Sequence, residues 1–99
     1  MDAQSQICLF VEIHVKPGKQ GTFLSKLEQH AAGIRKEAGC ELLTILTDTN
    51  HPDNVLVWEV WTTRELWDQH MVNDASKAWG KIAKAYVYGE KITVMKPKL

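Results

Sequence analysis

The sequence has few cysteines and no pattern of metal ligands. Cys8 and Cys40 are its only two thiols, and neither has another cysteine or a histidine within four positions. Structural zinc sites need closely spaced cysteine and histidine ligands. Two cysteines in a chain without a secretory signal are more typical of reduced, packed side chains than of a disulfide. The sequence therefore predicts neither a metal site nor a disulfide framework.

Net charge and long apolar runs are missing as well. Twelve lysines and arginines balance twelve aspartates and glutamates, so the formal net charge is zero. The usual electrostatic basis for binding nucleic acid is therefore absent. No apolar run approaches the roughly 18–20 residues of a membrane span, and residues 1–6 are polar, unlike a secretory signal. We expect a cytoplasmic protein with no nucleic-acid partner and no membrane attachment.

The length of 99 residues predicts one domain over residues 1–99. A chain this short buries roughly 60–65% of its unfolded surface, which is enough for one modest core. Four tryptophans are present in so small a chain. Large rings must therefore fill that core or line a pocket within it.

The hydrophobic periodicity predicts the order of the elements. Apolar residues alternate over residues 6–15, as in a strand, and recur every three or four positions over residues 19–38, as in a helix that Gly39 would end. Later patterns predict strands at residues 40–48, 55–62 and 87–95, and helices at 63–71 and 75–85, the latter capped at Asn73. This order is the split βαβ pattern of a ferredoxin-like α+β fold with a four-stranded antiparallel sheet.

Residues 55–71 carry the densest set of candidate functional side chains. A strand bearing Glu59 and Trp61 leads into a short helix bearing Trp67 and His70. Thr62 and Glu65 stand three apart, the spacing of a capping box at a helix start. An acid, two large rings and a histidine, whose ordinary pKa lies near neutral pH, could form a site or could simply be packed in the core.

Two other histidines have less promising surroundings. His30 lies among polar residues of the first helix, so we expect it to be solvated. His51 precedes Pro52 within residues 48–54, which are dense in turn formers, and it is expected to be a turn residue.

The middle strands of the predicted sheet are apolar on both faces, although the helices can cover only one. In the first strand, alternate apolar residues suit the helices, whereas a solvated second face should be polar at alternate positions. The opposite face instead carries four large apolar side chains: Phe10, Leu56, Trp58 and Val60. We therefore expect a homodimer in which a second copy packs on this face about a two-fold axis.

Several segments together resemble the antibiotic biosynthesis monooxygenase (ABM) superfamily. They are the strand before Val15-Lys16-Pro17-Gly18, the Ala-Gly-Cys at 38–40, and residues 55–70 followed by an alanine-rich helix. The most specific part is Glu59, Trp61 and His70. The resemblance covers nearly the whole chain and implies a small dimeric α+β barrel. Its members include cofactor-independent monooxygenases that act on polycyclic aromatic or quinol substrates.

The resemblance also implies a ligand cavity between the sheet and the helices of each subunit. Successive side chains of a strand alternate between the two faces of the sheet, and this alternation places Val11, Glu59 and Trp61 on that side. The haem-degrading members of the superfamily would need an asparagine at Val11 and a ligating histidine at Gly80. Without an axial ligand, haem iron has no strong protein hold, so no cofactor is expected.

The leading functional hypothesis is a cofactor-independent oxidoreductase for a small aromatic or quinol substrate. His70 would be the base that removes a phenolic proton, and Glu59 would orient its imidazole. An apolar cavity walled by Trp61, and by Trp67 or Trp79, would stack on the substrate ring and exclude water.

Two alternatives remain open at this point. The chain could be an isomerase of a small carbonyl compound, which would use the same His70 and Glu59 without O₂. It could equally be a non-catalytic dimer that binds a small ligand, because a fold does not determine a reaction.

Overall fold

Four antiparallel strands form one sheet, and three helices cover one of its faces. The computed structural model describes residues 5–98. Its elements in chain order are β1 (Ile7–Val15), α1 (Gln20–Ile34), β2 (Cys40–Asp48), β3 (His51–Trp61), α2 (Arg64–Val72), α3 (Asp74–Ala83) and β4 (Val87–Met95). The strand order is β2-β3-β1-β4, with all pairs antiparallel. The predicted ferredoxin-like α+β fold is therefore confirmed.

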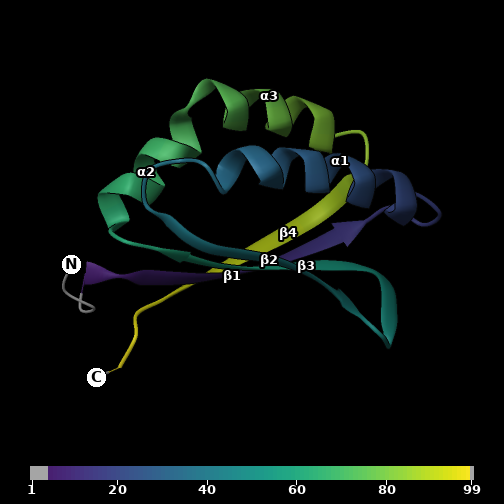
Figure 1. Cartoon of the computed structure of the whole chain (residues 1–99). Coiled ribbons are helices and arrows are strands. Elements are labelled where there is room, and N and C mark those ends of the chain that lie inside the picture. The colour runs from purple at the N-terminus through teal and green to yellow at the C-terminus, as the bar shows by residue number, and fades with distance from the viewer. Residues whose placement is uncertain (1–4, 99) are drawn as a thin grey trace.

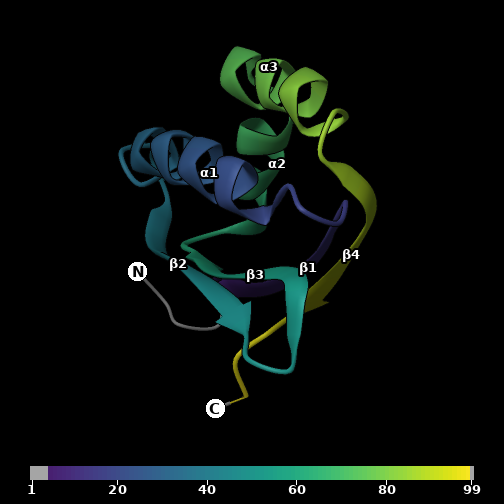
Figure 2. The same cartoon turned by 90° about the vertical axis from the view of Figure 1, so that its right-hand side faces the viewer.

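The helices form a layer above the sheet and leave its other face uncovered (Figure 1). Seen along the sheet, α3 is raised above both α1 and the strands (Figure 2). No residue of α3 is buried, although the helix is strongly amphipathic. Its apolar side therefore meets the rest of the subunit through partly buried residues such as Trp79.

The core lies between the sheet and α1. Alternate residues of β1 are buried, from Ile7 to Val15, as the period-two pattern predicts. Phe23, Leu27, Ala31 and Ile34 of α1 are buried at helical spacing and pack against them. Burying this apolar area, at roughly 25 cal/mol per Å², is the main force that holds the two layers together.

Apart from shifts of one or two residues, such as α3 ending at Ala83 instead of residue 85, three features differ from the sequence prediction. The helix predicted to residue 38 ends at Ile34, and tighter turns follow, in which Glu37 N donates to Ile34 O at 2.9 Å. The cap of α2 is Thr63, whose Oγ1 accepts from Leu66 N, and not Thr62. The hydroxyl and the amide of Thr62 both donate to Gly39 O, so Thr62 is already engaged. His51 begins β3 instead of lying in the turn.

Gly39 has a left-handed backbone, although it lies five residues beyond the end of α1. Its φ is +92°, and a Cβ placed there would lie 2.7 Å from Leu66. Glycine is therefore needed for both its conformation and its lack of a side chain. This close approach brings the turn after α1 against the start of α2, which is where the site is assembled.

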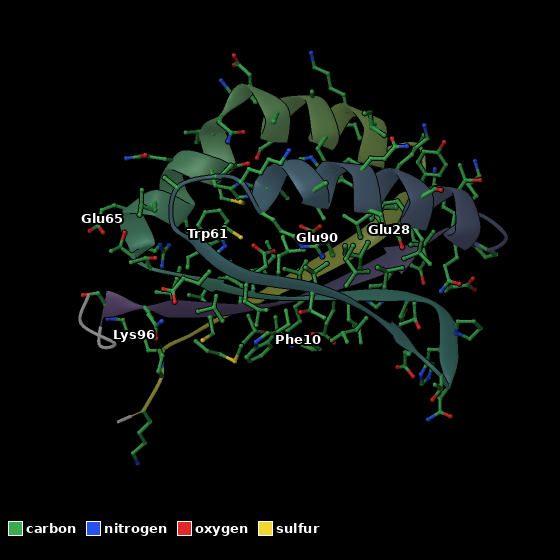
Figure 3. The ribbon with its side chains drawn as sticks, viewed as in Figure 1. Phe10, Glu28, Trp61, Glu65, Glu90 and Lys96 are labelled. Atoms are coloured by element: carbon green, nitrogen blue, oxygen red, sulfur yellow. The ribbon has the colours of Figure 1, made fainter. Side chains whose placement is uncertain are left out.

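The sheet face away from the helices carries large apolar side chains on its middle strands, as predicted. Phe10 pairs with Trp58 across β1 and β3, and their rings are 6.3 Å apart. Figure 3 shows Phe10 on this face and Trp61 on the opposite one. Leu42 and Leu46 pair with Val60 and Leu56, and both leucines are more than 40% exposed in the single chain.

Candidate functional site

A cavity of about 270 Å³ lies between the sheet and the three helices. The floor is formed by side chains of the strands and the walls by side chains of α1, α2 and α3. Five of the residues predicted for the site line it: Val11, Glu59, Trp67, His70 and Trp79. The fold therefore brings Val11 of β1 together with residues of three consecutive elements, β3, α2 and α3.

Trp61 does not line this cavity, so its predicted place as a wall is wrong. Its side chain is completely buried, between the sheet and the helices (Figure 3). Its Nε1 donates to Glu59 Oε1 at 2.9 Å, and its ring centroid lies 4.9 Å from that of His70. The indole therefore holds in place two side chains that do line the cavity.

The carboxylate that contacts His70 is Glu37, not the predicted Glu59. His70 is 8% exposed, and its Nδ1 lies 2.8 Å from Glu37 Oε1. Asn73 Nδ2 donates to the same carboxylate oxygen at 3.1 Å. A carboxylate at Nδ1 favours the tautomer with the proton on that nitrogen, which leaves Nε2 as an acceptor. Because the imidazole lines the cavity, Nε2 is the nitrogen available to a ligand.

The backbone around His70 is also tightly held. Ser76 Oγ donates to the carbonyl oxygen of His70 at 2.6 Å. Asn73 caps α3 as predicted, because its Oδ1 accepts from Ser76 N at 2.8 Å. The junction between α2 and α3 is thus held by two residues: Asn73 contacts Glu37, and Ser76 contacts the last turn of α2, which carries His70.

His30 is a site residue that the sequence prediction missed. The prediction of a solvated side chain is wrong, because His30 is partly buried and lines the cavity. Its ring stacks on Trp79 with centroids 4.7 Å apart and planes only 8° from parallel. Burial lowers the pKa of His30, and a charge on His70 lowers it further, while Glu37 raises it. These two flat rings form one side of the cavity.

Two carboxyl groups of the sheet also face the cavity. Glu59 on β3 is 8% exposed. Burial is the main cause that raises its pKa, and the charges of Glu90 and Glu37 act in the same direction; the Trp61 hydrogen bond and the nearby His70 lower it. Glu90 on β4 lies between the sheet and the helices in Figure 3, and partial burial raises its pKa as well.

Cations and metal ligands are scarce around the site. The residues of the described chain that line the cavity include no lysine and no arginine. Within residues 5–98, no group of three or more histidine, cysteine, aspartate or glutamate side chains is arranged to hold a metal ion. No helix of the described chain is both long enough and apolar enough to cross a bilayer.

Comparison with known proteins identifies relatives of the fold. Residues 6–81 match the sequence model of the family described as antibiotic biosynthesis monooxygenase. PA3566 from Pseudomonas aeruginosa aligns with a TM-score of 0.90 at 18% identity over 100% of each chain. SO0527 from Shewanella oneidensis aligns with a TM-score of 0.89 at 21% identity, over 95% of this chain and 92% of its own. No curated protein matches the sequence. At these identities the solved structures establish the fold alone.

Proposed function

This chain belongs to the antibiotic biosynthesis monooxygenase family, and on that premise we propose that it oxidises a small aromatic or quinol substrate with O₂, without a cofactor. The observation that carries the proposal is the histidine in the cavity. His70 is nearly buried, its Nδ1 is engaged by Glu37, and its Nε2 is left for a ligand. A base positioned by a carboxylate, at the wall of a mainly apolar cavity, is what proton abstraction from a phenol requires.

The reaction begins with transfer of the phenolic proton to Nε2 of His70. The resulting phenolate passes one electron to O₂, the substrate radical and superoxide then combine through a C–O bond, and the peroxide anion takes back the proton held on Nε2, which forms the hydroperoxide and restores the neutral imidazole. Loss of water from this hydroperoxide leaves a hydroxyquinone. The four electrons that reduce O₂ all come from the quinol, one oxygen atom enters the product, and the other leaves as water.

The other side chains of the cavity would bind and surround the substrate without taking part in proton transfer. Trp67, Trp79 and the His30 ring provide flat or apolar surfaces against an aromatic substrate. Val11 contributes an apolar part of the floor. Displacing water from such a cavity strengthens the electrostatic interactions within it and protects the reactive intermediates. Trp61 takes part indirectly, by holding Glu59 and His70.

Oxygen consumption tests the proposal directly. A panel of benzene and naphthalene quinols and anthrone-like phenols is mixed with the protein, and O₂ uptake is recorded against a protein-free blank. We expect uptake with at least one member, one O₂ per product, and no requirement for added metal or flavin. Turnover that persists without O₂ would support the isomerase alternative instead. Tight binding with no product from any member would support the non-catalytic binder.

We also propose that the chain forms a homodimer through the uncovered sheet face. Phe10, Leu56, Trp58 and Val60 share this face, together with the exposed Leu42 and Leu46. Exposed apolar patches of this kind mark association surfaces. An interface of roughly 800 Å² per partner would be of standard size.

A matched pair of substitutions tests this interface. Val60→Glu places a carboxylate within the uncovered face, whereas Val72→Glu makes the same change at an exposed position on α2, 65% exposed. We expect sedimentation at micromolar concentration to give a dimer for the wild type and for Val72→Glu, and a monomer for Val60→Glu. A wild-type protein that sediments as a single copy would contradict the proposal.

A further inference from the structure

The cavity has an unusual balance of charge for a ligand site. Two carboxyl groups, Glu59 and Glu90, and two imidazoles, His30 and His70, are its only titratable lining groups in the described chain. With no lysine or arginine on its lining, it has no permanent positive charge to pair with a carboxylate, sulfonate or phosphate. A bound anion would lose its hydration without a compensating ion pair.

Glu59 is placed to act as a hydrogen-bond donor. Its Oε1 already accepts from Trp61 Nε1, so a proton on the carboxyl group resides on Oε2, the oxygen without that bond. Burial raises the pKa of the group, which favours this protonated form. The titratable groups around it come from five segments: Cys40 on β2, Glu37 after α1, His30 on α1, His70 on α2 and Glu90 on β4.

The shape of the cavity limits the ligand further. Its volume of about 270 Å³ lies below the usual range for ligand sites, which begins at about 300 Å³. The parallel rings of His30 and Trp79 present a flat wall. One aromatic ring or two fused rings fit this space, whereas larger ring systems would need the walls to move.

We propose that the cavity selects uncharged planar aromatics of one or two rings that carry a hydroxyl group and a second oxygen able to accept a hydrogen bond, either a quinol hydroxyl or a carbonyl, and that it rejects the corresponding anions. Protonated Glu59 donates to this second oxygen, which is the carbonyl oxygen in a ketone ligand, and Nε2 of His70 accepts from the hydroxyl group. Glu90, nearer the solvent, repels anions that approach the cavity. This inference rests on the proposed function because it describes the ligand of the same site.

A pair of nearly isosteric ligands provides the test. The neutral probe is 6-hydroxy-2-acetonaphthone, and the anionic probe is 6-hydroxy-2-naphthoate, in which a carboxylate oxygen replaces the methyl group. Binding is followed at mildly acidic pH, where the naphthoate is still ionised, without O₂, by quenching of tryptophan fluorescence. We expect the ketone to bind at least about tenfold more tightly, which corresponds to about 1.4 kcal/mol. Equal affinity, or failure of both probes to bind, would overturn the inference.

The dependence on pH separates Glu59 from general apolar binding. Ketone affinity should fall as the pH rises through the raised pKa of Glu59, because the ionised carboxylate can no longer donate and repels the carbonyl oxygen. Glu59→Gln keeps an N–H donor and an acceptor for Trp61, so its ketone affinity should not change over that range. A wild-type affinity that stays flat would overturn the assignment of Glu59.

Two further variants test the exclusion of anions. Glu90→Gln removes the carboxylate at the cavity and should reduce the preference for the ketone several-fold. Glu28→Gln removes the same charge from an exposed position on α1 and should leave the preference unchanged. Oxygen uptake is then measured separately. Ketone binding without turnover of any quinol would refute the proposed function and leave this inference standing. Efficient oxidation of anionic quinols would support the proposed function and refute this inference.

Discussion

Replacing His70 by alanine should reduce O₂ uptake with the best quinol by about 10²–10⁴-fold, the usual contribution of a positioned general base. The ligand should bind no more than about tenfold more weakly than to the wild type, because one hydrogen bond is lost while the aromatic walls of the cavity remain. His70 is 8% exposed and its Nδ1 contacts Glu37, so the variant loses the base and leaves a space the size of an imidazole beside Glu37. The measurement is kcat from oxygen uptake beside Kd from fluorescence.

Two controls make this result specific. Imidazole added to the buffer should restore part of the turnover of His70→Ala, because it can occupy the vacated space and accept the proton. His51→Ala removes an exposed imidazole at the start of β3 and should leave kcat unchanged. If His70→Ala keeps wild-type kcat, then His70 is not the base and the proposed mechanism is wrong.

Glu37 should affect the same rate through His70. Glu37→Gln exchanges the carboxylate for an amide, which no longer favours one imidazole tautomer by its charge. We expect a loss of kcat smaller than that of His70→Ala, and no additional loss when the two substitutions are combined, because both act on one unit. Additive losses would mean that Glu37 has a separate role.

Replacing Trp61 by alanine should lower the free energy of unfolding by about 3–5 kcal/mol, the typical cost of removing a buried tryptophan. The side chain is completely buried, so its removal leaves a cavity that the packed layers cannot close. It also removes the hydrogen bond to Glu59 and the ring contact with His70. The loss is measured by urea unfolding at one fixed protein concentration, since association would make the midpoint concentration-dependent.

A second substitution separates packing from hydrogen bonding. Trp61→Phe keeps an aromatic ring but removes the Nε1–H group, so we expect a smaller loss of about 1–3 kcal/mol. Trp79→Ala, at a half-buried ring, should cost less than Trp61→Ala. A loss below about 1 kcal/mol for Trp61→Ala would show that this indole is not the anchor between Glu59 and His70 that its contacts indicate.

Much of the fold could be predicted from local sequence patterns. The bounds predicted for β2 and β4 are those observed, and the apolar alternation in β1 corresponds to its buried face. These features depend on residues only a few positions apart, and the geometry of a single helix or strand fixes which of their side chains share a face. The capping of α3 by Asn73 is of the same kind.

The errors have a common physical cause. Thr62 was the expected cap of α2, but its hydroxyl and amide are taken by Gly39, 23 residues earlier in the chain. His30 was expected in solvent, but α3 folds back and places Trp79 over its ring. In each case a contact from a distant segment competes with the local preference and prevails.

The sequence by itself determined the elements, their order, the family and a set of candidate residues around His70. Only the tertiary structure decided how those residues act on one another: Glu37 meets His70 across 33 positions, and Trp61 lies behind the cavity wall. No periodicity connects Glu37 with His70, because their contact depends on the turn at Gly39 and on the close approach of that turn to Leu66. Local patterns record which face of an element is buried, whereas hydrogen-bond partners across elements are set by how the whole chain packs.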